Sequence, residues 1–265
     1  MLGNKKCYLG VDIGSVAVST AIIDEQEQLV SQDYRFHHGS IADSVAASLN
    51  AHPIHTVTLV GYTSGSPRVL TNGSQVDDRV AFITAARTRQ QNIGSLLIVG
   101  GEHFSMIHFD ETGAYRRLLT NSSCAVFAKT DLIHAQAEGY SLSEICDGLC
   151  VGLAKNIADT LTSDEAPPKP IACAGGVSKN SAVLHHLEQL LHTDIEVDPE
   201  AHIFGALGAA LYVKRNEKTK THARIAFSDL VKQEQEQKEF FYPPLSLQYS
   251  TPPDFSGLHS YRYNS

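Results

Sequence analysis

The sequence predicts an α/β protein built from two similar lobes, and three observations lead to this prediction. An apolar run over residues 8–23 is broken only at residues 12–15 and resumes with β-branched residues, a pattern typical of a strand, a tight turn and a second strand. The pattern returns over residues 95–109, where an apolar run ends in two glycines and an alternating stretch follows. After each predicted hairpin, segments whose apolar residues have helical spacing alternate with short predicted strands.

The tip of the first predicted hairpin carries groups suited to a phosphate and a metal ion. Asp12 can hold Mg²⁺ through water, Gly14 leaves backbone N–H groups open to a phosphate, and Ser15 adds a hydroxyl donor. The alternative interpretation is an ordinary hairpin with a solvated aspartate.

The rest of the first lobe follows from the spacing of apolar residues. Residues 28–36 alternate as a third strand that ends at His37 and His38. We expect a solvated loop end there in preference to a metal site, because neighbouring residues on a strand point to opposite faces. Four further segments complete the lobe: a helix over residues 41–49, a buried strand over 56–60, a cleft loop over 61–67 and a helix over 76–89.

The second lobe contains a long helix that begins with a capping box. Ser141 and Glu144 form the box, and an apolar stripe at i, i+4 spacing runs from there to Leu161. Cys146 and Cys150 lie beside this stripe. We interpret them as small buried residues and not as metal ligands, because no further Cys or His lies near them.

A second glycine-rich strand end follows in the same lobe. A buried strand over residues 171–174 leads into Gly175 and Gly176, and a helix follows over residues 181–191. Paired glycines at such a junction let a ligand lie against bare backbone, with helix N–H groups pointing at it. The alternative is a tight strand-to-helix turn. A strand over residues 194–197 and a helix of small residues that starts at residue 205 close the lobe.

Length, composition and charge exclude several classes of protein. The chain has 265 residues, 42% hydrophobic and 19% charged, which suffices for one large domain or two lobes. No segment approaches the roughly 18–20 apolar residues of a membrane span, and residues 1–6 lack the apolar core of a signal peptide, so we expect a cytoplasmic protein without membrane association. The formal charge of −8 disfavours nucleic-acid binding, and five cysteines fit reduced thiols better than a disulfide framework.

Four stretches of the chain resemble the activator ATPases of 2-hydroxyacyl-CoA dehydratases and benzoyl-CoA reductases, the BadF/BadG/BcrA/BcrD type. They are GVDIGSVAVSTAIID at residues 10–24, SSCAVFAKTDLIHAQAEGYSLSEICDGLCVGLAKNIADTL at 122–161, IACAGGVSKNSAVLHHLEQLL at 171–191 and FGALGAALY at 204–212. The glycine-bearing strand ends also resemble the nucleotide clamp of the superfamily that includes actin, sugar kinases and heat-shock chaperones.

This resemblance implies an actin-like ATPase fold. Two ribonuclease H-like lobes, over residues 1–95 and 96–214, would enclose a nucleotide cleft, and residues 215–265 would form an extended tail or linker. The family is implied to work as an ATP-driven electron donor. A homodimer binds ATP or ADP with Mg²⁺, holds one four-iron four-sulfur cluster at its interface, and passes an electron to an acyl-CoA dehydratase or reductase component.

The resemblance also assigns site residues by motif. Asp12 would hold Mg²⁺ through water and act in catalysis. Glu102, at a position where the family usually has Gln, is a second catalytic candidate that could stand in for a missing Asp. Ten residues would contact the nucleotide, its phosphates at the two hairpin tips and its adenosine near residues 175–180: Gly14, Ser15, Gly100, Gly101, Gly175, Gly176, Val177, Asn180, Gly205 and Gly208.

The chain departs from the family pattern at two places. The family has an Asp two residues before the second glycine pair, whereas this chain has Ile98, which predicts slow or absent hydrolysis unless Glu102 substitutes. The family has two cluster cysteines per subunit, whereas only Cys124 matches here, which predicts no complete cluster. Cys124 is then a remnant ligand or a residue that packs at a helix start. The alternative function is a non-hydrolysing regulatory module that binds nucleotide.

The last part of the chain differs in composition. Residues 232–239 are a run of charged and polar residues. Residues 240–265 are rich in Pro, Tyr and Phe and show neither the helical nor the strand spacing of apolar residues. We expect this segment to lie extended over another surface, since exposed aromatics are costly in water. The alternative is a disordered C-terminus.

Overall fold

The computed structural model describes residues 6–67, 69–122, 134–161, 166–217 and 224–231. Contacts divide the chain into one compact unit over residues 1–233 and a second unit over residues 234–265. All described residues belong to the first unit. Cys124 and the predicted segment over residues 240–265 lie outside the described residues.

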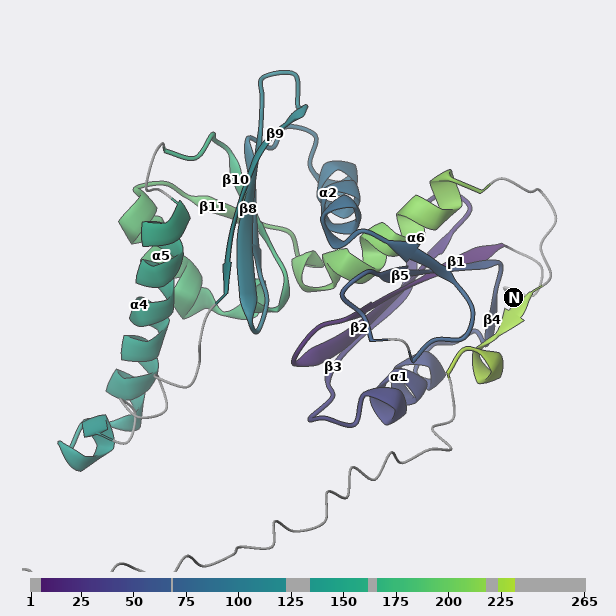
Figure 1. Ribbon diagram of the computed structural model, residues 1–265, viewed down its shortest axis with the longest axis horizontal. Helices are drawn as coiled ribbons and strands as arrows, with labels where there is room; N and C mark the ends of the chain where they lie inside the picture. Colours follow the sequence, from purple (N-terminus) through teal and green to yellow (C-terminus); the bar gives the residue numbers. More distant parts are fainter. Residues whose placement is uncertain (1–5, 68, 123–133, 162–165, 218–223, 232–265) are drawn as a thin grey trace, which may run out of the picture. The chain divides into compact units, whose positions relative to one another are not determined.

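The first sheet has five strands in the order β3-β2-β1-β5-β6 (Figure 1). The strands β1, β2 and β3 form an antiparallel meander, and β1, β5 and β6 are parallel to one another. This confirms the predicted hairpin and third strand. The bounds are β1 Cys7–Ile13, β2 Ala17–Asp24, β3 Leu29–Phe36, β5 Leu59–Thr63 and β6 Ser74–Val76.

The second sheet repeats this topology with the order β11-β10-β7-β8-β9. Its first three strands in sequence are antiparallel, and β7, β10 and β11 are parallel. The predicted repetition of the first lobe is therefore confirmed, while β9 is a strand that the sequence analysis did not predict. The bounds are β7 Ser95–Val99, β8 His103–Phe109, β9 Tyr115–Ser122, β10 Ile171–Ala174 and β11 Ile195–Val197.

Helices cover both faces of the second sheet. Figure 1 shows α4 and α5 on one side of it and α2 on the other, in agreement with their contacts. The helix α6 packs against β1, β2 and β5 and crosses α2. No helix among the described residues is long and apolar enough to cross a membrane. The bounds are α1 Ile41–Asn50, α2 Asp78–Arg89, α4 Leu142–Leu161, α5 Ser181–Leu191 and α6 Phe204–Arg215.

The small residues of α6 let it lie directly on the first sheet. Every residue from Phe204 to Leu211 is buried. Gly10 and Gly61 on the facing strands provide the space, since a Cβ at Gly61 would lie 2.5 Å from the carbonyl oxygen of Ala209. This corrects the start of the cleft loop predicted over residues 61–67: the strand β5 continues to Thr63, because Gly61 serves close packing and not a turn. The rest of the prediction is confirmed, since Ser64, Gly65 and Pro67 line a cavity.

Two further expectations need correction. The second predicted helix begins at Asp78 and not at Val76, because Val76 pairs in β6 and Asp77 caps the helix by accepting from two backbone N–H groups. Cys146 is exposed and Cys150 half-buried, so the interpretation of both as small buried residues is wrong. The first half of α4 extends past the second sheet in Figure 1, and Cys146 lies on that half.

The start of the predicted tail packs against the first sheet. Strand β12 (Ile225–Ala226) pairs with β4 (Thr56–Val57), and a short 3-10 turn follows at Phe227–Asp229. Phe227 and Leu230 are buried in the same apolar cluster as α1. The limits of the two lobes and of the tail stay predictions.

Candidate functional site

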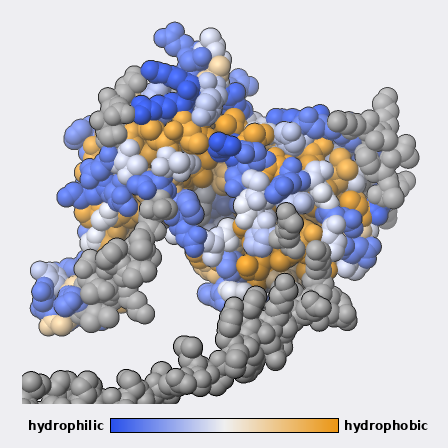
Figure 2. All heavy atoms as spheres, in the orientation of Figure 1, coloured by the Kyte–Doolittle hydropathy of each residue, from blue (hydrophilic) through white to orange (hydrophobic). Residues whose placement is uncertain are grey.

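A cavity of about 810 Å³ lies between the two hairpin tips, and a recess near the centre of Figure 2 marks its opening. Its walls come from the β1–β2 turn, the β7–β8 turn, the loop after β10, and the start of α2. Eight of the predicted site residues line it: Asp12, Gly14, Ser15, Gly100, Gly101, Glu102, Gly175 and Gly176.

Asp12 is the carboxylate of the first wall, and neighbouring hydroxyls hold it. Its Oδ1 accepts a 2.6 Å hydrogen bond from Thr63 Oγ1, which is itself 2.9 Å from Ser66 Oγ. Burial raises the pKa of Asp12 to about 6; Thr63 works against this rise, and the charge of Asp78 adds to it. Gly205 lies against the same carboxylate, where a Cβ would overlap it, so the positive end of the α6 dipole faces Asp12.

His37 fixes the turn that carries Gly14. The Gly39 N–H donates to Nδ1 of His37 at 3.0 Å, so Nδ1 is unprotonated and Nε2 carries the proton. Nε2 therefore donates to the carbonyl oxygen of Gly14, 3.2 Å away, and the His37 N–H donates to the Val16 carbonyl at 3.1 Å. The expectation of a solvated loop end is wrong for His37, which is 8% exposed because its ring lies under the turn, and right for the exposed His38.

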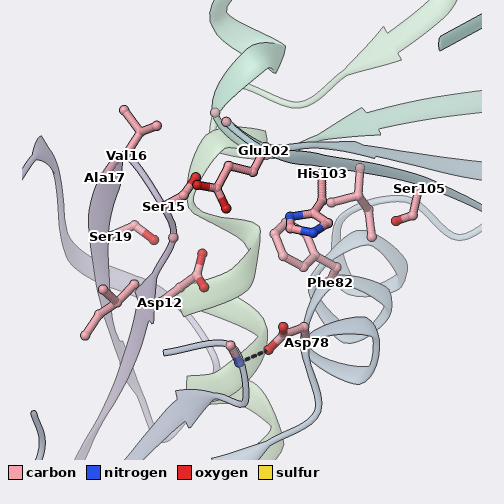
Figure 3. Close-up of a pocket in the computed structure, with 18 of the residues that line it drawn as sticks. Asp12, Ser15, Val16, Ala17, Ser19, Asp78, Phe82, Glu102, His103 and Ser105 are labelled. Atoms are coloured by element: carbon pink, nitrogen blue, oxygen red, sulfur yellow. Dashed lines mark hydrogen bonds between the residues drawn. The ribbon is translucent and has the colours of Figure 1, made fainter. Parts of the chain in front are cut away.

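The second turn faces the first across the cavity. The Gly100 N–H donates to the carbonyl of His103 at 2.9 Å and closes the turn. A Cβ on Gly101 would come within 2.9 Å of Ser15 Oγ, which shows how closely the two tips approach. The exposed Glu102 extends into the cavity on the side of Ser15 in Figure 3. Ile98, which precedes the glycines, also lines the cavity.

The third glycine loop presents bare backbone. Gly175 has a φ of 93°, and a Cβ there would lie 2.5 Å from the Val99 carbonyl oxygen. Both facts restrict this position to glycine. At Gly176 a Cβ would lie 2.7 Å from the hydroxyl of Tyr34, which reaches this loop from β3.

Four predicted nucleotide contacts do not line the cavity. Asn180 caps α5 through Oδ1, which accepts from two backbone N–H groups. Val177 packs against the apolar cluster between the second sheet and helices α4 and α5. Gly208 lies at the crossing of α6 and α2, where a Cβ would overlap the Ala81 carbonyl. Gly205 reaches the site through Asp12. The nucleotide roles of these four residues stay predictions.

Several lining residues escaped the sequence analysis. Ser19 pairs with Asp12 and Tyr34 pairs with Ser19, so both reach the cavity through a register that the sequence alone does not reveal. Asp78 accepts from the Gly65 N–H at 2.9 Å, the bond drawn in Figure 3, and from Ser64 Oγ at 2.9 Å. A helix start rich in Asp was the available signal for Asp78.

The cavity is acidic. Asp12, Asp78 and Glu102 line it, while the charge of Asp77 is shared with Arg79 in an ion pair of 3.0 Å. Across the described part of the chain, no three His, Cys, Asp or Glu side chains converge as a metal site. A polyphosphate entering here therefore needs a cation, and that cation needs water and ligand oxygens to complete its shell.

Comparison with known proteins supports the resemblance. The model of the BadF/BadG/BcrA/BcrD ATPase family matches residues 85–213, so this part of the chain is similar to that family. The resemblance stated from the sequence is thereby confirmed.

Individual relatives agree with the family match. The activator of lactoyl-CoA dehydratase from Anaerotignum propionicum is 36% identical over 92 residues, which are 35% of this chain and 35% of that protein. The (R)-2-hydroxyglutaryl-CoA dehydratase activating ATPase of Acidaminococcus fermentans is 23% identical over 77% of this chain and 95% of its own. Both names refer to activators of acyl-CoA dehydratases.

A solved structure shares the fold. The activator of 2-hydroxyisocaproyl-CoA dehydratase from Clostridium difficile, solved with bound ADPNP, superimposes with a TM-score of 0.71 at 18% identity, over 82% of this chain and 99% of its own. The predicted two-lobed ATPase fold is therefore confirmed.

Proposed function

We propose that the chain binds ATP with Mg²⁺ in the cavity between the two hairpin tips. The observation that supports this most is the convergence of three glycine-bearing loops and one carboxylate, Asp12, on a single cavity. Its volume of about 810 Å³ falls within the range of small-molecule sites. The structural relative with bound ADPNP supports the same ligand class.

The residues present fit this ligand. The turns at Gly14 and at Gly100–Gly101 would meet the phosphates, and the backbone at Gly175–Gly176 would meet the adenosine side. Mg²⁺ would neutralise phosphate charge in a cavity that already holds several carboxylates, and Asp12 would hold it through water.

Nucleotide binding would allow the protein to activate a partner enzyme. We infer that the partner is a component of an acyl-CoA dehydratase or reductase, because the relatives are named as activators of such enzymes. The resemblance read from the sequence further implies that the active form is a homodimer. The full proposed activity is transfer of an electron to this partner, coupled to ATP hydrolysis.

A second candidate function is a regulatory module that binds nucleotide without turnover. Ile98 favours it, because an apolar side chain lines the cavity where the family motif has an Asp. The number of cysteines also favours it, because only Cys124, outside the described residues, matches a cluster position of the family, and the described cysteines lie on β1, β10 and α4. Anaerobic reconstitution with iron counting tests this. About four irons per dimer, lost in Cys124→Ala, would favour the redox activator.

Calorimetry with Mg²⁺ and ATP tests the binding proposal. We expect the wild type to bind and Asp12→Ala to bind at least about tenfold more weakly, since a charged hydrogen-bond acceptor near the cation is lost. Asp159→Ala is the control, because Asp159 is exposed on α4, outside the cavity lining. Absence of ATP binding to the wild type, or equal affinities of wild type and Asp12→Ala, would contradict the proposal.

A further inference from the structure

The hydroxyl of Ser19 is buried and has no hydrogen-bond partner among the described residues. Ser19 is 2% exposed, and its Oγ is an unpaired polar atom. Other buried hydroxyls are paired: Thr20 Oγ1 is 2.8 Å from Ser48 Oγ, and Ser95 Oγ donates to the Pro168 carbonyl at 2.6 Å. A buried polar group without a partner destabilises a fold, so Ser19 calls for an explanation.

The position of Ser19 connects it to the cavity. It lies directly opposite Asp12 in the β1–β2 ladder and opposite Tyr34 in the β2–β3 ladder. Residues that face each other across a ladder project from the same side of a sheet. All three line the cavity, and Figure 3 shows the Ser19 hydroxyl on the same side of β2 as the carboxylate of Asp12.

We propose that Ser19 is a ligand-contacting residue, whose hydroxyl accepts a hydrogen bond from a water of the Mg²⁺ that Asp12 holds. This inference rests on the proposed binding of ATP with Mg²⁺. One oxygen of Asp12 is already engaged by Thr63, and a phosphate oxygen placed directly between Asp12 and Ser19 would face the carboxylate charge. A metal-bound water instead donates hydrogen bonds, and both the carboxylate and the hydroxyl can accept them.

The inference differs from a purely structural role in a measurable way. If no protein atom pairs with Ser19, Ser19→Ala removes a buried unpaired group, so the melting temperature without ligand stays equal or rises. Ser95→Ala is the matched control. It also removes the hydroxyl of a buried serine on a strand, but it breaks a hydrogen bond to the Pro168 carbonyl, and neither residue lines the cavity. We therefore expect the melting temperature of Ser95→Ala to fall.

The test titrates Mg²⁺ into protein held at a fixed concentration of ADPNP and also records melting temperatures without ligand. For Ser19→Ala we expect the half-saturating Mg²⁺ concentration to rise about three- to tenfold, as for one lost hydrogen bond. Affinity for ADPNP at saturating Mg²⁺ should change less. For Ser95→Ala we expect the wild-type Mg²⁺ dependence.

Three outcomes would overturn the inference: an unchanged Mg²⁺ dependence in Ser19→Ala, a lower melting temperature like that of Ser95→Ala, or an equal loss of ADPNP affinity at saturating Mg²⁺. In each of these the wild type still binds ADPNP, so the proposed function survives. A wild type that fails to bind ADPNP at any Mg²⁺ concentration would instead refute the proposed function itself.

Discussion

The hydroxyl of Thr63 donates a 2.6 Å hydrogen bond to Oδ1 of Asp12 and joins the end of β5 to the end of β1. The bond favours the charged carboxylate, yet burial opposes it more strongly, and the pKa of Asp12 rises from 3.8 to about 6. The free protein therefore holds a carboxylate whose charge is costly until a cation arrives.

The stability of the ligand-free protein should consequently fall as pH rises through the pKa of Asp12. The folded state binds the proton more tightly than the unfolded state, so this contribution is complete below about pH 4 and lost above about pH 6. Asp12→Asn should remove the penalty. We expect it to unfold like the wild type near pH 4 and to be more stable at pH 7.5 by on the order of 3 kcal/mol, at about 1.4 kcal/mol per pKa unit.

Urea unfolding in chelator at both pH values measures this difference, with Asp159→Asn as an exposed control. A gap between Asp12→Asn and wild type that does not change with pH would show that Asp12 titrates normally.

The imidazole of His37 should determine how well the first turn is formed. His37→Ala removes the donor to the Gly14 carbonyl, so the turn loses an anchor and the Kd for ADPNP with Mg²⁺ should rise about five- to tenfold. His38→Ala is the matched control, since His38 is the exposed neighbour. Calorimetry compares the two variants, and equal affinities would show that the turn holds its shape without His37.

Replacing Ile98 tests turnover. We expect little phosphate release by the wild type, and a higher rate for Ile98→Asp, because an acidic group near the metal-bound water can orient it. Ile98→Asn is the control with similar size and no charge. Brisk hydrolysis by the wild type would be inconsistent with this account and would direct attention to Glu102→Gln.

The helix crossing at Gly208 should tolerate no side chain. Gly208→Ala places a Cβ against the Ala81 carbonyl, and we expect a loss of about 1–3 kcal/mol in the free energy of unfolding. Gly152→Ala on α4 has no atom within 4 Å of its new Cβ, so it should be neutral or stabilising by about 0.5–1 kcal/mol. Denaturant unfolding checks both, and a neutral Gly208→Ala would mean that the helices can separate.

Local sequence patterns were sufficient to predict the two hairpin tips. A turn such as that at Gly14 depends on neighbouring residues alone, so apolar runs and glycines were enough to find it. Ser19 and Tyr34 belong to the same site but depend on strand pairing, and a single sequence does not state which residues a ladder places opposite Asp12. His37 depends on a side-chain hydrogen bond to the Gly14 carbonyl, which the sequence does not state either.

Glycine caused the opposite error. Gly61 was assigned to a loop, whereas the structure shows it in β5, against the backbone of α6. Gly208 also lies against helix backbone, and its predicted nucleotide contact stays a prediction. A missing side chain serves a turn, a ligand and close packing equally well, and only the neighbours in space distinguish these uses. Likewise, helical spacing predicted the whole of α4 but could not show that the half with Cys146 extends past the sheet.

The shared topology of the two sheets suggests an internal duplication, and the two hairpins correspond position by position. Asp12 stands two residues before Gly14 and faces Ser19 across its ladder, while Ile98 stands two residues before Gly100 and faces Ser105. At these matching positions the first hairpin has an acidic residue and the second an aliphatic one. The two halves of the cavity therefore share a backbone plan but differ in charge at the position two residues before each glycine, so a cation would be bound from the side of Asp12 alone at this level.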